Sequence, residues 1–416
     1  MADQILLRTN ALLIGTGLIF AAGALLGLAL PIRAELEGFP TFLIGLIGSA
    51  FAAGFVAGSL LVPRLVAKVG HIRVFGVMAT LVATTALINL LFIDPIAWIL
   101  VRAMTGFAFA GATMIIESWL SESSTSETRG GVFARYMIVT LASSVIGQLT
   151  VTFYQPAGFE PFALVAILAC LALVPTALSS SRAPDPLHEV RFDFKRLIRV
   201  SPIAVVACFG IGLANGAFGT LAPLYAHSIG FPIGAVALVV AGAVVGGALM
   251  QAPVGWLSDR MDRRWLLVWI ALLGAVLALA LFLLDLRDPA AVILMVALLG
   301  GAMHTLYPVA VAHANDRAEK GDFVVIASGL LLIFGGGATL GPAVAAPMMQ
   351  LGEQRWLFLF LVLVYVSVAL HAAWRTRLAP SVAESQHAYV ALEPMQSASP
   401  EAMYLDPRAE EETSNG

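Results

Sequence analysis

Apolar stretches of about twenty residues recur along the chain, separated by short polar segments. An α-helix of this length rises about 30 Å, the thickness of the hydrocarbon core of a bilayer. Helices are expected because lipid offers no water to exposed backbone groups, and the alternation typical of barrel strands is absent. The predicted spans are 11–32, 41–62, 74–93, 96–119, 132–153, 161–179, 201–226, 233–254, 265–284, 289–313, 323–349 and 355–374. The pattern therefore predicts an all-α polytopic membrane protein with twelve transmembrane helices.

The composition agrees with this pattern. Hydrophobic residues make up 59% of the 416 residues and charged residues 12%, whereas soluble domains carry about 25% charged residues. The first apolar run continues into a second span, so we interpret it as an uncleaved helix rather than a signal peptide. Cys170 and Cys208 both fall inside apolar runs. Neither a disulfide framework nor a metal site is therefore expected.

Lysine and arginine are concentrated in alternate loops. With the N-terminus inside, the inner segments hold Arg8, Arg64, Lys68, Arg73, Arg129, Arg135, Arg182, Arg191, Lys195, Arg196, Arg199, Arg260, Arg263, Arg264, Arg317, Lys320, Arg375 and Arg377. The opposite loops hold Arg33, Arg287 and Arg355. Because cytoplasmic loops are enriched in lysine and arginine, both termini are expected in the cytoplasm.

The chain divides into two related halves. A polar, proline-containing segment at 180–200 follows the sixth span and is predicted to be a cytoplasmic linker. Shifts of 192 or 194 residues align Gly27 with Gly219, Pro31 with Pro223, Gly54 with Gly246 and Gly147 with Gly341. Residues 1–179 and 201–379 are thus predicted to form two six-helix bundles. The acidic tail, 380–416, is predicted to be disordered and cytoplasmic.

The loop after the eighth predicted span carries the most specific motif. Residues 255–264 read GWLSDRMDRR. This run resembles the G-x-L-(A/S)-D-R-x-G-R-R loop of the major facilitator superfamily, with Asp262 in place of the usual glycine. The counterpart loop of the first half keeps Gly70 but has Ala67 where the aspartate is expected. The resemblance implies a bacterial permease of the inner membrane, with the family's fold of two pseudo-symmetric six-helix bundles.

In that family the loop is a conformational latch, which contacts neighbouring helix ends in one conformation and releases them in the other. The resemblance assigns this role here to Gly255, Asp259, Arg260, Arg263 and Arg264. Asp259 is suited to it because a carboxylate accepts charge-assisted hydrogen bonds from arginine or from a helix N-terminus. The alternative is a positively charged loop that only sets topology.

Arg102 is the most unusual residue of the predicted spans. It lies in the run LVRAMTGFAFAG at 100–111, which resembles the family's second signature, an R-x-x-(Q/T)-G-x-G-like run in the same helix. A guanidinium within the membrane needs a partner or a watery cavity. Arg102 either steers a proton or binds an anionic substrate group, or else it bonds to carbonyl groups of a neighbouring helix.

Two further ionisable residues lie well inside the predicted spans. Glu117 follows Arg102 on the same helix at a distance of about 22 Å, so the two side chains cannot pair. It is either a proton carrier or the partner of Arg64 or Arg135 in a salt bridge at the helix end. His304 is either a proton relay or substrate-binding group, or a histidine bonded to a neighbouring carbonyl.

Uncharged polar residues are sparse in the spans. Those considered are Asn89, Gln148, Asn215, Tyr225, Gln251 and Tyr307. In the family, spans 1, 4, 7 and 10 line the central path. The resemblance therefore implies that Asn215, Tyr225, His304 and Tyr307 face the cavity, although each side chain can equally bond a neighbouring helix.

A glycine-rich run, GGGATLGP at 335–342, lies in the eleventh predicted span. Glycine lets helix backbones approach and proline permits a bend, so Gly337, Gly341 and Pro342 are predicted to bend this helix. The run resembles the G-x-x-x-G-P run that antiporters of the family carry on span 5. Span 5 here has only Gly147 followed by Gln148, a departure that argues against drug–proton antiport.

Several function classes find no support in the sequence. It has no G-x-x-x-x-G-K-(S/T) loop of an ATP-driven pump, no HExxH or Cys–His cluster, and no nucleophile–base constellation in a loop. We expect no enzymatic activity, no cofactor and no bound metal. The basic loop residues are explained by topology, so no nucleic-acid partner is expected.

The favoured function is a secondary active transporter that moves a small organic solute by alternating access between the two halves. A proton or another coupling ion would supply the energy. Predicted spans 1 and 7 lack carboxylates, which argues against a cationic solute and favours a neutral one or a monoanion paired with Arg102. We expect a monomer in the lipid bilayer. The alternative is a non-transporting membrane sensor or assembly partner, with the acidic tail as its output element.

Overall fold

The computed structural model describes residues 2–122, 128–177, 193–318 and 323–378. Its helices are α1 (Ala2–Leu36), α2 (Thr41–Val69), α3 (His71–Leu91), α4 (Pro95–Glu122), α5 (Arg129–Thr150), η1 (Val151–Phe153), α6 (Glu160–Ala177), α7 (Phe194–Val200), α8 (Pro202–Ser228), α9 (Ile233–Ser258), α10 (Arg263–Leu283), α11 (Pro289–Asn315), α12 (Phe323–Leu351) and α13 (Trp356–Leu378). The described residues form no strand.

Eleven of these helices are long and apolar enough to cross a membrane, and the apolar part of α6, Glu160–Pro175, is shorter. The predicted all-α, polytopic architecture is confirmed, with α6 as the twelfth helix of the two bundles. Part of the predicted linker falls outside the described residues, and 194–200 of it forms the short helix α7. The predicted acidic tail, 380–416, also lies outside the described residues.

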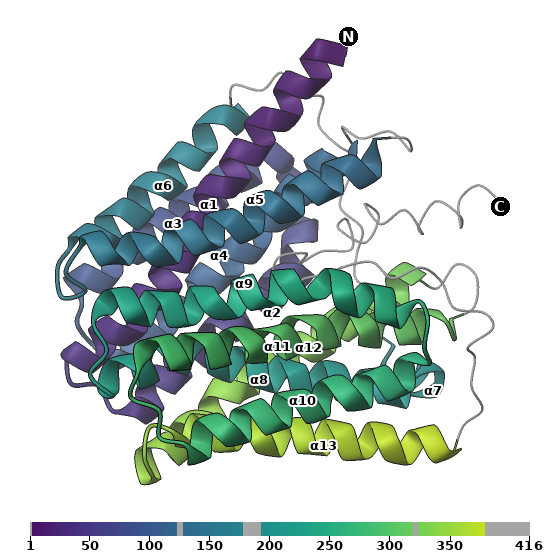
Figure 1. Cartoon of the computed structure of the whole chain (residues 1–416). Helices are drawn as coiled ribbons and strands as arrows, with labels where there is room; N and C mark the ends of the chain where they lie inside the picture. Colours follow the sequence, from purple (N-terminus) through teal and green to yellow (C-terminus); the bar gives the residue numbers. More distant parts are fainter. Residues whose placement is uncertain (1, 123–127, 178–192, 319–322, 379–416) are drawn as a thin grey trace.

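The helices form two groups in space, α1–α6 (the N half) and α8–α13 (the C half), as Figure 1 shows. In the N half, α1 packs on α5 and α6, α2 on α4, and α3 on α4 and α6. In the C half, α8 packs on α12 and α13, α9 on α11, and α10 on α11 and α13. The second set repeats the first with each helix replaced by its counterpart. The two halves are therefore pseudo-symmetric, as the sequence alignment predicts.

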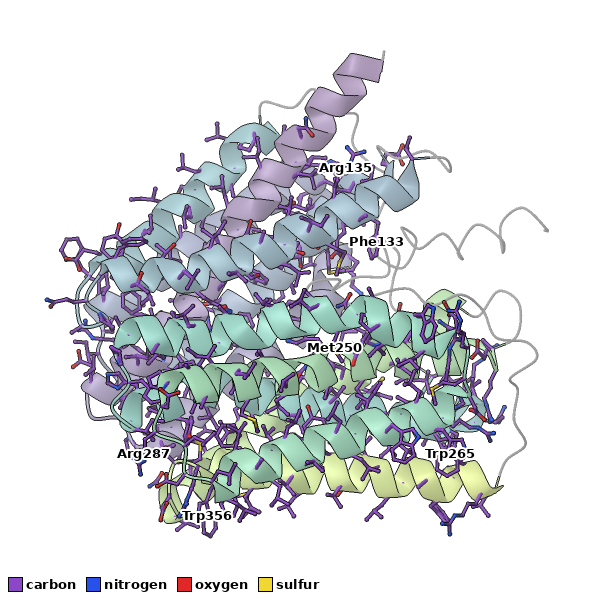
Figure 2. All side chains as sticks on the ribbon, in the orientation of Figure 1. Phe133, Arg135, Met250, Trp265, Arg287 and Trp356 are labelled. Atoms are coloured by element: carbon purple, nitrogen blue, oxygen red, sulfur yellow. The ribbon has the colours of Figure 1, made fainter. Side chains whose placement is uncertain are left out.

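The outer surface of the bundle is apolar. Large aliphatic side chains such as Leu249, Val276 and Leu294 are exposed at 70%, 62% and 62%. Tryptophan lies at both ends of the C half, with Trp356 at one end and Trp265 at the other (Figure 2). An apolar belt between interfacial aromatic residues is the surface that lipid requires.

Paired glycines bring helices together at equivalent places in the two halves. In the N half, a methyl group at Gly54 would overlap the carbonyl oxygen of Ala103, and one at Gly106 would overlap that of Phe51. In the C half, the same holds for Gly246 with Ala297, and for Gly300 with Ala243. The crossings of α2 with α4 and of α9 with α11 are thus backbone to backbone, as small residues permit in membranes.

The glycine-rich run of α12 makes a similar crossing with α8. Methyl groups at Gly337 and Gly341 would overlap the carbonyl oxygens of Phe209 and Leu213. The helix continues without interruption through Pro342. The run therefore serves close packing, and the bending predicted for Gly337, Gly341 and Pro342 stays a prediction.

Gly337→Ala is expected to lower thermal stability, whereas Gly336→Ala is not. The first variant forces α12 away from the Phe209 carbonyl, and such overpacking costs about 1–3 kcal/mol. A methyl group at Gly336 would meet nothing within 4 Å, and alanine favours the helix over glycine by about 1 kcal/mol. The midpoint of thermal unfolding of the purified proteins in one detergent measures the difference. Equal midpoints would contradict the backbone crossing.

The bundle has two distinct ends. We call the end at which α1 begins and α13 ends the terminal end, and the other the distal end. Several contacts between the halves lie toward the distal end, where α2 packs along α12 and a methyl group at Gly45 would overlap the Pro342 carbonyl region. The backbone N–H of Phe42 donates to Gln350 Oε1 at 3.0 Å. Figure 1 shows α1 and α5 leaning away from α9 toward the terminal end.

Candidate functional site

A cavity lies between the two halves near the middle of the bundle. It has two lobes that share the residues Ala24, Gly27, Gln148, Asn215, Gly219 and Val244. The Arg102 lobe has a volume of about 280 Å³, and the His304 lobe, which contains His304 in its wall, about 240 Å³. We call the two lobes together the central cavity. Its size suits a small organic molecule, because ligand pockets measure about 300–1,000 Å³.

Aromatic side chains line both lobes of the central cavity. Phe20, Phe51 and Phe109 line the Arg102 lobe, and Phe218 and Phe334 line the His304 lobe. The Phe20 and Phe109 rings meet edge to face with centroids 5.3 Å apart. Edge-to-face packing is a favourable geometry for two aromatic rings, and it holds Phe20 and Phe109 in place in the wall of the Arg102 lobe.

Arg102 lies on the buried face of α4 and is 8% exposed. Its guanidinium carbon lies 4.2 Å from the centroid of the Phe51 ring. Across the lobe, a methyl group at Gly27 would lie 4.0 Å from its Nη2 atom. Among the described residues, Arg102 has neither a hydrogen-bond nor an ion-pair partner, so the carbonyl-bonded alternative receives no support. The Arg102 guanidinium therefore lies between the face of the Phe51 ring and the central cavity.

Two carboxamides lie where the lobes meet. Gln148 comes from α5 and Asn215 from α8, so each half contributes one. The Gln148 Oε1 and Asn215 Oδ1 atoms are buried and have no hydrogen-bond partner in the described part of the chain. Buried polar atoms are normally bonded, and a group left without a partner is a candidate ligand contact.

His304 lines the second lobe from α11 and packs its ring against Gly247 of α9. The structure thus brings Arg102, Asn215 and His304 together at one cavity. Gln148 joins them, although the rule that spans 1, 4, 7 and 10 line the path gave no reason to place a residue of span 5 there. The available signal was its polarity next to Gly147, which packs α5 against the backbone of α1.

The other predicted pathway residues lie outside the walls of both lobes. The Tyr136 hydroxyl donates to the Glu117 carboxylate at 2.7 Å, and Glu117 is fully buried. Tyr225 packs against Phe358 of α13, with ring centroids 4.8 Å apart. Tyr307 packs against Phe334 at 5.5 Å, and its buried hydroxyl has no partner among the described residues.

The predicted latch loop joins three helices of the C half. Arg263 is fully buried, and its Nη1 donates to both oxygens of Asp316, beyond the end of α11, at 2.6 and 2.7 Å. Its Nε donates to Ser258 at 2.9 Å, and Asp259 lies 3.3 Å from its Nη2. The Arg260 guanidinium stacks on Trp256 at 4.2 Å. Asp316 was missed by the sequence analysis, because a single acidic residue after an apolar run carries no signal of its partner.

Asp262, which stands where the family has glycine, makes two contacts that a glycine could not make. Its carboxylate caps α10 by accepting from the backbone N–H of Arg264 at 3.0 Å, and it binds the Arg264 guanidinium at 2.6 Å. Burial, with Arg264 nearby, lowers the pKa of Arg317 from its ordinary value, yet a guanidinium stays charged in proteins. Asp262 and Asp316 therefore offset a local concentration of positive charge.

A second polar contact joins the halves at the distal end. His227 Nδ1 lies 2.7 Å from Glu35 Oε2, linking the end of α8 to the end of α1. The two residues are 192 positions apart, the same offset that aligns the halves. They are therefore equivalent positions of the two repeats, and equivalent positions can meet where both lie near the pseudo-two-fold axis.

Replacing this pair by Glu35→Gln and His227→Ala is expected to shift the protein toward a form open at the distal end. The double variant removes a bond between the halves, while Glu37→Gln is a matched control because Glu37, one residue beyond the end of α1, pairs with Arg33 of that helix at 2.6 Å. Labelling of Thr220→Cys, which packs against Gly48 of the other half, measures the opening. Cys170 and Cys208 are first replaced by alanine. Equal labelling of the double variant and the control would show that the contact between Glu35 and His227 does not hold the distal end closed.

Two pseudo-symmetric six-helix halves around a central cavity are an architecture found in many membrane transporters. The model of the family described as Major Facilitator Superfamily matches residues 12–247 and 204–399. The chain belongs to the major facilitator superfamily, as the loop at 255–264 indicates. It is a multi-pass transporter of that family, whose members bind small-molecule substrates within a membrane.

Curated relatives cover most of the chain. It is 28% identical over 359 residues to the uncharacterized MFS-type transporter Ent638_1421 of Enterobacter sp. (strain 638), covering 85% of this chain and 92% of the relative. It is 28% identical over 376 residues to the uncharacterized MFS-type transporter YcaD of Salmonella arizonae, with coverages of 88% and 96%.

Solved structures share the fold at low identity. The nucleoside transporter NupG gives a TM-score of 0.75 at 14% identity, covering 89% of this chain and 99% of that one. An inward-facing, occupied bacterial homologue of the lysosomal transporter Spinster gives 0.71 at 14% identity, with coverages of 91% and 96%. The transporter FucP in the outward conformation gives 0.56 at 16% identity, with coverages of 89% and 99%.

Proposed function

We propose that this protein is a secondary active transporter that moves a small organic solute across the bacterial inner membrane by alternating access, driven by a proton gradient. The observation that carries the proposal is the central cavity, which lies between two pseudo-symmetric halves and holds Arg102, an arginine with no hydrogen-bond or ion-pair partner among the described residues. A fixed site between two rocking bundles is the geometry that alternating access requires. The protein works as a monomer, because one chain supplies both halves.

The terminal end is the cytoplasmic end in this proposal. Lysine and arginine are concentrated in the segments at that end, as the positive-inside rule requires of cytoplasmic loops. The contacts between Glu35 and His227 and between Phe42 and Gln350 then close the periplasmic side. The higher TM-score with the inward-facing Spinster homologue than with outward FucP is consistent with an inward-facing form.

Proton coupling is supported by the titratable group in the cavity. His304 lines the wall of the second lobe, and a histidine changes charge near neutral pH. A proton that binds one conformation better than the other biases their equilibrium by that difference in affinity. Glu117, bonded to Tyr136, lies outside both lobes and is the second candidate proton carrier.

Flux in proteoliposomes tests the proposal. Purified protein is reconstituted with an imposed pH gradient, and uptake of a panel of radiolabelled anionic, neutral and cationic metabolites is measured. Solute accumulation that collapses with a protonophore is expected, and protein-free liposomes supply the control. Absence of gradient-dependent flux for every solute would defeat the proposal. The sensor alternative depends on the tail at 380–416, which lies outside the described residues.

We propose further that the loop at 255–264 is the conformational latch, through Asp259 and its contact with Arg263. Asp259→Asn removes a charge from this contact and is expected to change the balance between inward-open and outward-open forms. Labelling of Thr220→Cys from each side of the membrane measures that balance. If Thr220→Cys is labelled identically with and without the Asp259→Asn change, the loop at 255–264 has only a topological role.

A further inference from the structure

The charge balance of the central cavity points to the sign of its ligand. The described residues that line the two lobes include one arginine, Arg102, and neither aspartate, glutamate nor lysine. Removing a guanidinium from water is unfavourable by several kcal/mol unless an opposite charge or a set of hydrogen bonds replaces the water. The described walls supply no such counter-charge. An anionic group on the solute would supply it.

The surroundings of Arg102 favour an organic acid over a simple charge. Phe51 contacts the guanidinium at 4.2 Å through its ring and uses none of its N–H donors. No described residue accepts a hydrogen bond from Arg102, so its planar set of five donors is available to a ligand. Such a fork matches the two oxygens of a carboxylate.

The carboxamides where the lobes meet add a second recognition element. Gln148 and Asn215 line both lobes, and their buried oxygens have no hydrogen-bond partner within the described residues. An amide oxygen accepts a hydrogen bond from an O–H or N–H group, and leaving a buried amide oxygen without such a donor is unfavourable. Phe20 and Phe109 add apolar surface to the wall of the Arg102 lobe.

We infer that the solute is a small amphipathic organic monoanion. Its carboxylate pairs with Arg102, a hydrogen-bonding group lies near Gln148 and Asn215, and its apolar body packs against the phenylalanines. This inference rests on the proposed function, since it names the substrate class of the same cavity. A neutral solute would leave the Arg102 charge uncompensated, and a cation would be repelled by it.

Binding to purified protein in nanodiscs tests the inference without any flux. The probes are benzoate, 4-hydroxybenzoate, phenylacetate and octanoate, each with its primary carboxamide, and chloride alone. At least one carboxylate is expected to bind about tenfold or more tightly than its carboxamide, and this preference is lost in Arg102→Gln. Arg287→Gln is the matched control, because it removes the same charge from an exposed arginine that pairs with Asp285 at 3.0 Å and lies outside both lobes.

The second element has its own measurement. Asn215→Ala is expected to remove the preference for 4-hydroxybenzoate over benzoate and to leave the preference for carboxylates over carboxamides. Carboxamides that bind as tightly as carboxylates, or a preference that survives Arg102→Gln, would overturn the inference. Equal binding of chloride and the organic acids would overturn it as well. Carboxylate binding without gradient-driven flux would refute the proposed function alone, and flux of neutral solutes only would refute the anion site alone.

Discussion

Arg102→Ala is expected to lower transport by about 10- to 100-fold, because hydrogen bonds to charged groups contribute about 1.5–3 kcal/mol and each 1.36 kcal/mol is tenfold in rate. The guanidinium faces the central cavity, contacts the Phe51 ring and has no hydrogen-bonding partner among the described residues. The variant thus removes a charge from the central cavity and leaves no carboxylate of the described residues unpaired. Initial rates of gradient-driven uptake in proteoliposomes measure the loss.

The thermal midpoint separates this role from a structural one. A buried, unpaired guanidinium is unfavourable, so Arg102→Ala should not lower the midpoint of unfolding. Arg287→Ala is the control, because Arg287 is an exposed arginine at the distal end (Figure 2). Its guanidinium pairs with Asp285 at 3.0 Å. The control removes the same charge and should leave uptake unchanged. Normal uptake with a reduced midpoint in Arg102→Ala would make Arg102 a structural residue.

Asp316→Ala is expected to give the largest loss of stability of the variants considered. Arg263 is fully buried, and its Nη1 donates to both carboxylate oxygens of Asp316. The side chain of Asp316 is itself only 3% exposed. Removing one partner of a buried ion pair costs about 3–5 kcal/mol, because the other charge stays buried. The thermal midpoint of the purified protein in detergent measures the change.

Asp285→Ala provides the comparison for this effect. Asp285 pairs with Arg287 at 3.0 Å, but the two side chains are half-exposed or more. Exposed pairs contribute about 0–1 kcal/mol, so the midpoint of this variant should stay close to that of the unchanged protein. If both aspartate variants lowered the midpoint equally, the loop at 255–264 would not be anchored through Asp316.

The elements of the fold were accessible from the sequence because the bilayer imposes one length and one kind of structure. Runs near twenty apolar residues predicted α1–α6 and α8–α13, whereas α7 lies in the segment predicted as the linker. The repeat offset of 192 residues predicted the pseudo-symmetry. It did not predict that Glu35 and His227 meet, because this depends on how close both positions lie to the axis between the halves.

The cavity was predicted only in part, because the choice of helix does not fix the face of the helix. Arg102, Asn215 and His304 line it. Tyr225 follows Asn215 by ten residues, which turns it about 80° around the helix and moves it about 15 Å along the axis. It therefore packs against α13 instead. The pairing of Arg263 with Asp316 was hidden for a related reason, since residues 53 positions apart reveal their contact only in the packed bundle.

A reversible cross-link between the halves tests alternating access most directly. Glu35→Cys and His227→Cys are introduced into a chain whose Cys170 and Cys208 are alanine, and a short bis-thiosulfonate reagent joins the two thiols. The control pair, Arg33→Cys with Glu37→Cys, joins α1 to the residue that follows its last residue and does not link the halves. The account predicts that gradient-driven flux stops when positions 35 and 227 are joined, returns on reduction, and persists in the control. Full flux with the 35–227 cross-link in place would contradict it.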